Sequence, residues 1–170
     1  MLRAVGVLLL AGSGLALGLG AVERLTRQCR ELSDLAGALS RAEAELTLSV
    51  PSTPALLEGL AHQSSGRAGA FFRFCLEHLN QLGEREFSAI WSDALTASGL
   101  SLPQAIRGQM EALGQALGRY DTEQLLRCCS QTRKSLESEA GRLREELRSQ
   151  GKVYGTLGLT MGIFCAILLL

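Results

Sequence analysis

Residues 121–148 read DTEQLLRCCSQTRKSLESEAGRLREELR, and their pattern decides the fold class. Apolar and small residues recur here at spacings of four and three, namely Leu125, Cys129, Thr132, Leu136, Ala140, Leu143 and Leu147. This spacing places them on one face of an α-helix, so the stretch predicts a long helix with one buried face. Its start resembles a capping box, with Asp121 as the cap and Gln124 three residues later. We interpret the charged outer faces as solvated, although the same pattern allows a coiled-coil seam for a partner.

The chain before residue 121 also has a helical character. Valine and isoleucine are scarce between residues 23 and 152, whereas alanine, leucine, glutamate, arginine and glutamine are plentiful. Periodicity and turn residues predict five further helices, at about residues 23–48, 55–63, 68–82, 84–97 and 103–118. The sequence therefore predicts an all-α fold, a compact antiparallel bundle of about six helices, in which the two long outer helices pack against each other.

One local signal concerns the start of the second helix. Thr53 is a good N-cap residue, and Pro54 suits the first helical position because its missing N–H needs no partner there. We therefore expect Thr53 and Pro54 to have a structural role.

Both ends of the chain are apolar. Ala4–Val22 and Val153–Leu170 contain no Asp, Glu, Lys, Arg or His in 19 and 18 residues, respectively. At about 1.5 Å per residue, helices of these lengths reach ~27–28 Å, close to the thickness of a bilayer's hydrocarbon core. We expect transmembrane helices at 1–22 and 153–170, flanking a soluble domain at 23–152. The alternatives are a cleaved signal peptide for the first segment and a buried core helix for the second.

The flanking charges predict the orientation. Basic residues lie on the inner side of both apolar segments: Arg24, Arg27, Arg30, Arg142, Arg144, Arg148 and Lys152. Outside them lies only Arg3. Because cytoplasmic flanks are rich in Lys and Arg, we expect the central domain in the cytoplasm and both termini across the membrane.

Glycines in the apolar segments suggest a packing face. Gly14 and Gly18 form one G-x-x-x-G pattern, and Gly158 and Gly162 form another. Glycine lets membrane helices approach closely, so these four residues are candidates for transmembrane packing, although glycine is common in membrane helices anyway.

The central domain carries no recognisable chemistry. Residues 23–152 hold 16 Lys and Arg against 17 Asp and Glu, a balance that does not favour nucleic acid. His62 and His78 belong to no metal-ligand pattern, and no nucleotide-binding loop or C-x-x-C motif occurs. We therefore expect no catalytic residue, no cofactor and no metal site, and we predict that the protein is not an enzyme.

Several strings resemble one family. They are E-x-E at residues 43–45, T-P at 53–54, W-x-x-A-L at 91–95, L-G-x-x-L-G-x-x-D at 113–121 and K-x-Y-x-x-L-G-x-x-x-G at 152–162. Together they resemble the stage III sporulation protein AB family over essentially the whole chain. The resemblance adds Trp91 to the structural candidates.

The resemblance implies a non-catalytic platform in the channel complex that joins mother cell and forespore. The family's soluble domain is similar to the helical domain of inner-membrane platform proteins in type II secretion and type IV pilus systems. The implied partners are a neighbouring cytoplasmic ATPase, other membrane subunits and further copies of the chain, at the mother-cell membrane around the forespore. A membrane-anchored helical sensor or signalling module is the alternative, and a membrane-tethered enzyme is a third reading.

Overall fold

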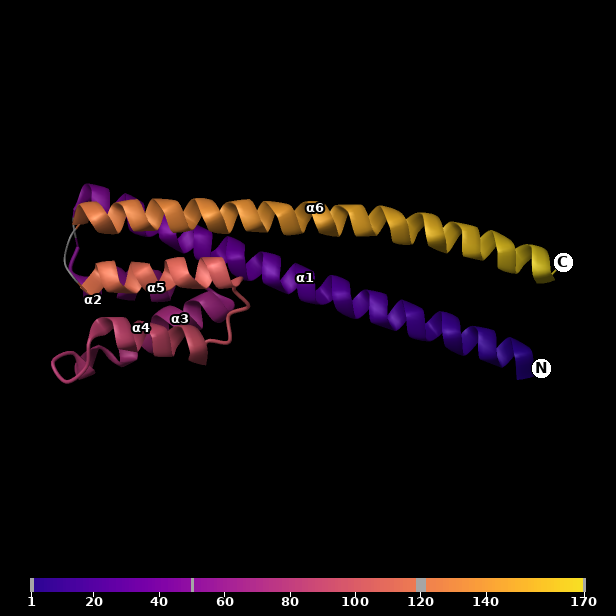
Figure 1. The fold of residues 1–170 in the computed structure, drawn as a ribbon, viewed down its shortest axis with the longest axis horizontal. Coiled ribbons are helices and arrows are strands. Elements are labelled where there is room, and N and C mark those ends of the chain that lie inside the picture. The colour runs from indigo at the N-terminus through magenta and orange to yellow at the C-terminus, as the bar shows by residue number, and fades with distance from the viewer. Residues whose placement is uncertain (1, 50, 119–121, 170) are drawn as a thin grey trace. The chain divides into compact units, whose positions relative to one another are not determined.

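The computed structural model describes residues 2–49, 51–118 and 122–169, and these residues form helices joined by short connections (Figure 1). The elements are α1 (Leu2–Leu48), α2 (Thr53–Gln63), α3 (Gly66–Glu77), the 3₁₀ helix η1 (Leu79–Gln81), α4 (Phe87–Ala97), α5 (Gln104–Gly118) and α6 (Thr122–Leu169). No β-strand occurs within these ranges, and one isolated bridge joins Leu82 to Arg85. The predicted all-α fold is therefore confirmed for this part of the chain.

The chain divides into two compact units. The larger unit comprises residues 30–140, and the second comprises residues 1–29 together with 141–170. Helices α1 and α6 each run through both units without a break. The two units are defined by contacts, whereas the limits of the expected membrane segments, after residue 22 and before residue 153, come from the apolar character of the sequence. These limits stay predictions.

Residues 4–22 and 153–169 of the two apolar segments are helical in backbone, at the start of α1 and the end of α6. The side chains of residues 1–19, 21 and 150–170 lie outside the described part of the structure. The expected packing glycines Gly14, Gly18, Gly158 and Gly162 fall in these ranges, so their packing face remains a prediction. Among the described residues, no helix is both long and apolar enough to cross a membrane.

Within the larger unit, successive helices alternate in direction (Figure 1). The residues of α1 and α6 that lie near each other run in opposite order: Leu46 and Leu125 line the same hollow, whereas Glu43, earlier on α1, pairs with Arg133, later on α6. The predicted antiparallel packing of these two helices is correct.

Most of the periodic residues are buried. On α6, the buried residues of the larger unit are Leu125, Cys129, Thr132, Leu136 and Ala140. On α1, they are Leu32, Leu35, Leu39, Ala42 and Leu46. In the second unit, Cys29 and Leu143 are buried, whereas Leu147, also expected on the buried face, is part-buried. Burying apolar area is the main stabilising term in folding, so these two stripes explain why the long helices adhere to the bundle.

Within the larger unit, the largest differences from the predicted helix boundaries lie on either side of Gly83. Helix α3 ends at Glu77 rather than near 82, and α4 begins at Phe87 rather than near 84. The 3₁₀ turn η1 and Gly83 lie between them. Gly83 has φ +115°, a conformation that L side chains rarely adopt, so the chain turns there and neither helix can extend through it.

Candidate functional site

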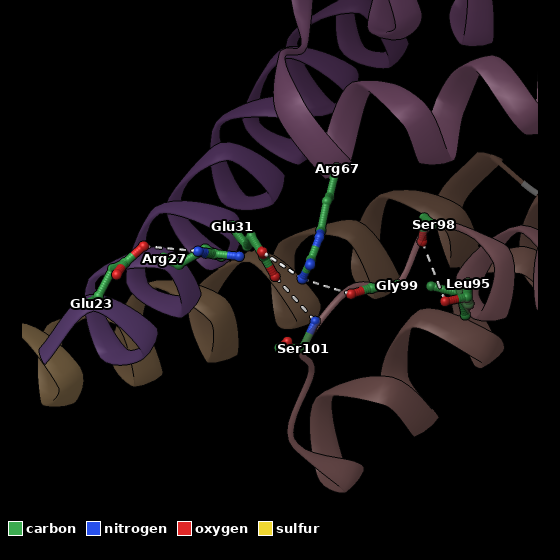
Figure 2. Close-up of polar contacts among 8 residues, drawn as sticks. All are labelled: Glu23, Arg27, Glu31, Arg67, Leu95, Ser98, Gly99 and Ser101. Carbon is green, nitrogen blue, oxygen red and sulfur yellow. Dashed lines mark hydrogen bonds and ion pairs between the residues drawn. The ribbon is translucent and has the colours of Figure 1, made fainter. Parts of the chain in front are cut away.

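A buried carboxylate, Glu31, joins three segments of the larger unit (Figure 2). Glu31 is 6% exposed, whereas the other charged side chains described on α1 are exposed or part-buried. Arg67 Nη1 at the start of α3 donates to Glu31 Oε1 at 2.9 Å. The backbone N–H of Ser101, in the α4–α5 connection, donates to Glu31 Oε2 at 3.1 Å.

Arg67 extends this cluster. The same Nη1 donates to the carbonyl oxygen of Gly99 at 2.9 Å. Gly99 lies two residues after the end of α4 and has φ +63°. Ser98 Oγ donates to the Leu95 carbonyl oxygen at 3.3 Å (Figure 2). We call Glu31, Arg67, Gly99 and Ser101 the carboxylate clamp. A buried charge is costly unless it is paired and hydrogen-bonded, and the clamp meets both conditions.

The sequence analysis does not predict the carboxylate clamp, although the position of Glu31 in the helical pattern indicates a buried carboxylate. Glu31 lies four residues before Leu35, which places it on the buried face of α1. A carboxylate on such a face needs a partner, but the partners come from residues 36 and 70 positions away in the chain.

Trp91, a structural candidate from the sequence, lies at the centre of an aromatic cluster. Its indole contacts Phe71 at a ring-centroid distance of 4.7 Å, and the planes are nearly perpendicular at 85°. Phe72 and Phe87 lie at 6.4 Å and 5.7 Å from it. The indole Nε1–H donates to the carbonyl oxygen of Met110 at 2.7 Å, so the buried polar atom is satisfied.

The L-G-x-x-L-G string has a physical explanation in this cluster. A Cβ added at Gly114 would lie 2.5 Å from Trp91 Cγ and 3.0 Å from Trp91 Cβ. Such distances are below van der Waals contact, so α5 approaches α4 this closely only because residue 114 has no side chain. At Gly118 the added atom would lie 3.7 Å from Phe87 Cβ, which is ordinary contact. The first glycine of the string is therefore the one that packing requires.

The expected caps have different outcomes. Ser52, and not Thr53, is the N-cap residue of α2, and no side-chain capping hydrogen bond forms there. Thr53 is the first helical residue, and Pro54 follows in the first turn. The prediction of Thr53 as N-cap was wrong by one residue, because the backbone turns into helix right after the extended Ser52. Asp121 lies outside the described residues, whereas Gln124 lies exposed in the first turn of α6.

A second ion pair ties α1 to α6. Arg133 Nε lies 3.1 Å from Glu43 Oε1, and Arg133 Nη1 lies 2.9 Å from Glu137 Oε1. The hydrogen bond to Glu43, followed by that to Glu137, raises the pKa of Arg133 above its ordinary value. The guanidinium thus stays charged, and the pair fixes the register of the two helices.

The cysteines and histidines form no reactive centre among the described residues. Burial raises the pKa of the Cys75 thiol to about 12, and burial followed by the nearby Glu43 carboxylate does the same for Cys129. Both therefore stay as inert thiols at neutral pH. His78 stacks on Phe74 and hydrogen-bonds its carbonyl oxygen through Nδ1 at 2.8 Å, whereas His62 is exposed. Within the same residues, no group of three or more His, Cys, Asp or Glu could hold a metal ion.

These features define an all-α helical protein whose described polar clusters bind its own helices together. The family model of Stage III sporulation protein AB (spore_III_AB) matches residues 3–170. The chain belongs to this family, and the resemblance seen in the sequence is confirmed.

A solved structure of the same description has a similar fold. It is "Stage III sporulation protein AB (SpoIIIAB)", with a TM-score of 0.60 and 19% sequence identity. The match covers 69% of this chain and 94% of the solved one. A comparison with curated protein sequences gives no match. Family membership supports a role in sporulation.

Proposed function

We propose that this protein is a non-catalytic platform in the channel complex between mother cell and forespore, where it docks a cytoplasmic secretion-type ATPase. The observation that carries the proposal is the family match over residues 3–170. The proposal is supported by the clamp and the Trp91 cluster, which connect α1, α3, α4 and α5 to one another. A rigid bundle is suited to binding a partner and holding it in place.

In this proposal, residues 1–22 and 153–170 span the mother-cell membrane, and the bundle lies on the cytoplasmic side. The support is the absence of charged residues from Ala4–Val22 and Val153–Leu170, together with the basic residues that flank them on the inner side. The helices α1 and α6 then connect the membrane directly to the bundle.

Cysteine labelling tests the topology. Cys75 is fully buried and cannot report accessibility, but Leu48 is 85% exposed at the end of α1. We expect Leu48→Cys, with Cys128 and Cys165 changed to serine, to resist a membrane-impermeant maleimide in intact cells and to react after permeabilisation. The parent without Leu48→Cys is the control. Rapid labelling in intact cells would place the bundle outside and reverse the proposed orientation.

Co-purification tests the platform role. We expect the full chain, extracted in mild detergent from sporulating cells, to bring the neighbouring ATPase with it, and deletion of the gene to block spore formation. The purified chain should hydrolyse no ATP by itself. Normal spores after deletion would contradict the platform proposal, and ATP hydrolysis by the purified chain would contradict its non-catalytic nature.

A further inference from the structure

Exposed leucines, two hollows and two exposed carboxylates lie at one end of the bundle. We define the loop end as the described residues 46–49, 51–53, 79–88, 115–118 and 122–125, where α1 and α5 end, α2, α4 and α6 begin, and η1 leads into α4 (Figure 1). The end of α5 lines two hollows. The start of α4 lines one of them, and the end of α1 and the starts of α2 and α6 line the other, so these segments lie close together. All of these residues belong to the larger unit.

The loop end exposes apolar surface. Leu48 is 85% exposed and Leu82 is 42% exposed, and these are the exposed large apolar side chains among the described residues. A single exposed leucine needs no explanation, but both occur at the same end of the bundle. Two exposed leucines at one end of the bundle favour the loop end as a surface that contacts a partner.

The two hollows at the loop end differ in character. One, of about 230 Å³, is lined by four leucines, Leu46, Leu56, Leu117 and Leu125, together with Pro51, Ser52, Thr53 and Thr122. The other, of about 450 Å³, lies between the start of α4 and the end of α5 and is lined by Glu86, Ser88 and Gln115 beside Phe87 and Gly118. The first suits an apolar side chain, and the second suits a polar or charged one.

The described residues of this end carry more acidic than basic groups. Glu84 and Glu86 are exposed, and among the described residues neither is paired with a basic group. Glu86 Oε2 accepts a hydrogen bond from Ser88 Oγ at 3.2 Å. The adjacent Arg85 does not neutralise them, because its Nη2 lies 2.7 Å from Asp93 Oδ2. A partner with positive charge would therefore be attracted here.

We propose that the loop end binds a protein segment in which a large apolar side chain stands beside Lys or Arg side chains. The apolar side chain enters the hollow lined by Leu46, Leu56, Leu117 and Leu125. The exposed Leu48 at the same end adds apolar contact, and the basic side chains pair with Glu84 and Glu86. A second copy of this chain fits less well, because a two-fold contact would bring the same carboxylates together. Anionic lipid headgroups are repelled by the same charge. The inference rests on the proposed function, in which this segment belongs to the ATPase.

The test measures the affinity of the full chain, in lipid nanodiscs, for the purified ATPase. We expect Glu84→Lys with Glu86→Lys to weaken binding by at least about tenfold, mainly through slower association and a smaller salt dependence. Leu48→Ala should weaken it by a similar factor through faster dissociation, without a change in thermal stability. The matched control is Asp34→Lys with Glu58→Lys, which makes the same charge change at exposed residues outside the loop end and should leave the affinity unchanged.

The outcomes separate the two proposals. If the unmodified chain does not bind the ATPase, the proposed function loses its partner and the inference falls with it. If the unmodified chain binds and the loop-end variants bind equally well, only the inference is wrong. If these variants leave that affinity unchanged but convert a dimer of the chain into monomers, the loop end pairs two copies and the proposed occupant is wrong.

Discussion

Replacing Gly114 with alanine is expected to destabilise the protein by about 3 kcal/mol, because overpacking of a filled core is costly. The added methyl would overlap the indole of Trp91, which is 1% exposed and enclosed by three phenylalanine rings. The indole cannot move away without losing its hydrogen bond to Met110. Alanine has the higher helix propensity, by about 1 kcal/mol, but this gain is smaller than the clash.

The measurement is thermal unfolding of the full chain in detergent micelles, followed by circular dichroism and by the fluorescence of the chain's one tryptophan. The matched control is Gly108→Ala on the same helix, where an added Cβ meets nothing within 4 Å. That variant should be slightly stabilised, since it gains helix propensity without a clash. Equal melting temperatures for the two variants would show that the approach of α5 to Trp91 is not required.

This contact also shows where sequence reasoning stops. Gly114 belongs to the L-G-x-x-L-G-x-x-D string and Trp91 to the W-x-x-A-L string, and each string by itself resembles the family. Nothing local connects them, because they lie 23 residues apart and meet only when α4 packs against α5. The role of the glycine follows from tertiary structure alone.

The helices themselves were more predictable. The stripes of α1 and α6 follow the helical period, and burial of one face follows directly from that period. The errors occur at helix ends, where Ser52 replaces Thr53 as N-cap and a 3₁₀ turn precedes Gly83. Ends depend on small differences among local hydrogen bonds, so several neighbouring residues suit them almost equally.

The carboxylate clamp was the least predictable feature, and it leads to a second large effect. We expect Glu31→Ala to cost about 2 kcal/mol, because it removes a buried carboxylate that accepts hydrogen bonds from the Ser101 N–H and from Arg67, whose side chain is 40% exposed. The Ser101 N–H loses this acceptor, and among the described residues Arg67 keeps its hydrogen bond to the Gly99 carbonyl oxygen. Glu31→Gln should cost less, since one amide oxygen can replace one of the two carboxylate oxygens.

The control for this variant is Glu111→Ala on α5. Glu111 pairs with Arg107 at 3.5 Å, and both side chains are more than 40% exposed. Exposed pairs contribute about 0–1 kcal/mol, so this substitution should shift the melting temperature little. The comparison separates the loss of a buried carboxylate from the loss of any glutamate.

A double-mutant cycle with Arg67→Ala isolates the interaction between Glu31 and Arg67. We expect a coupling energy of about 1–3 kcal/mol, because the two side chains share a hydrogen bond in which one partner is buried. Hydrogen exchange of the full chain should in addition show faster exchange at the Ser101 amide in Glu31→Ala than in Glu111→Ala, since its acceptor is gone. Additive losses in the cycle, together with unchanged exchange at Ser101, would mean that Glu31 stabilises α1 by its own burial and does not hold α3 and the α4–α5 connection in place.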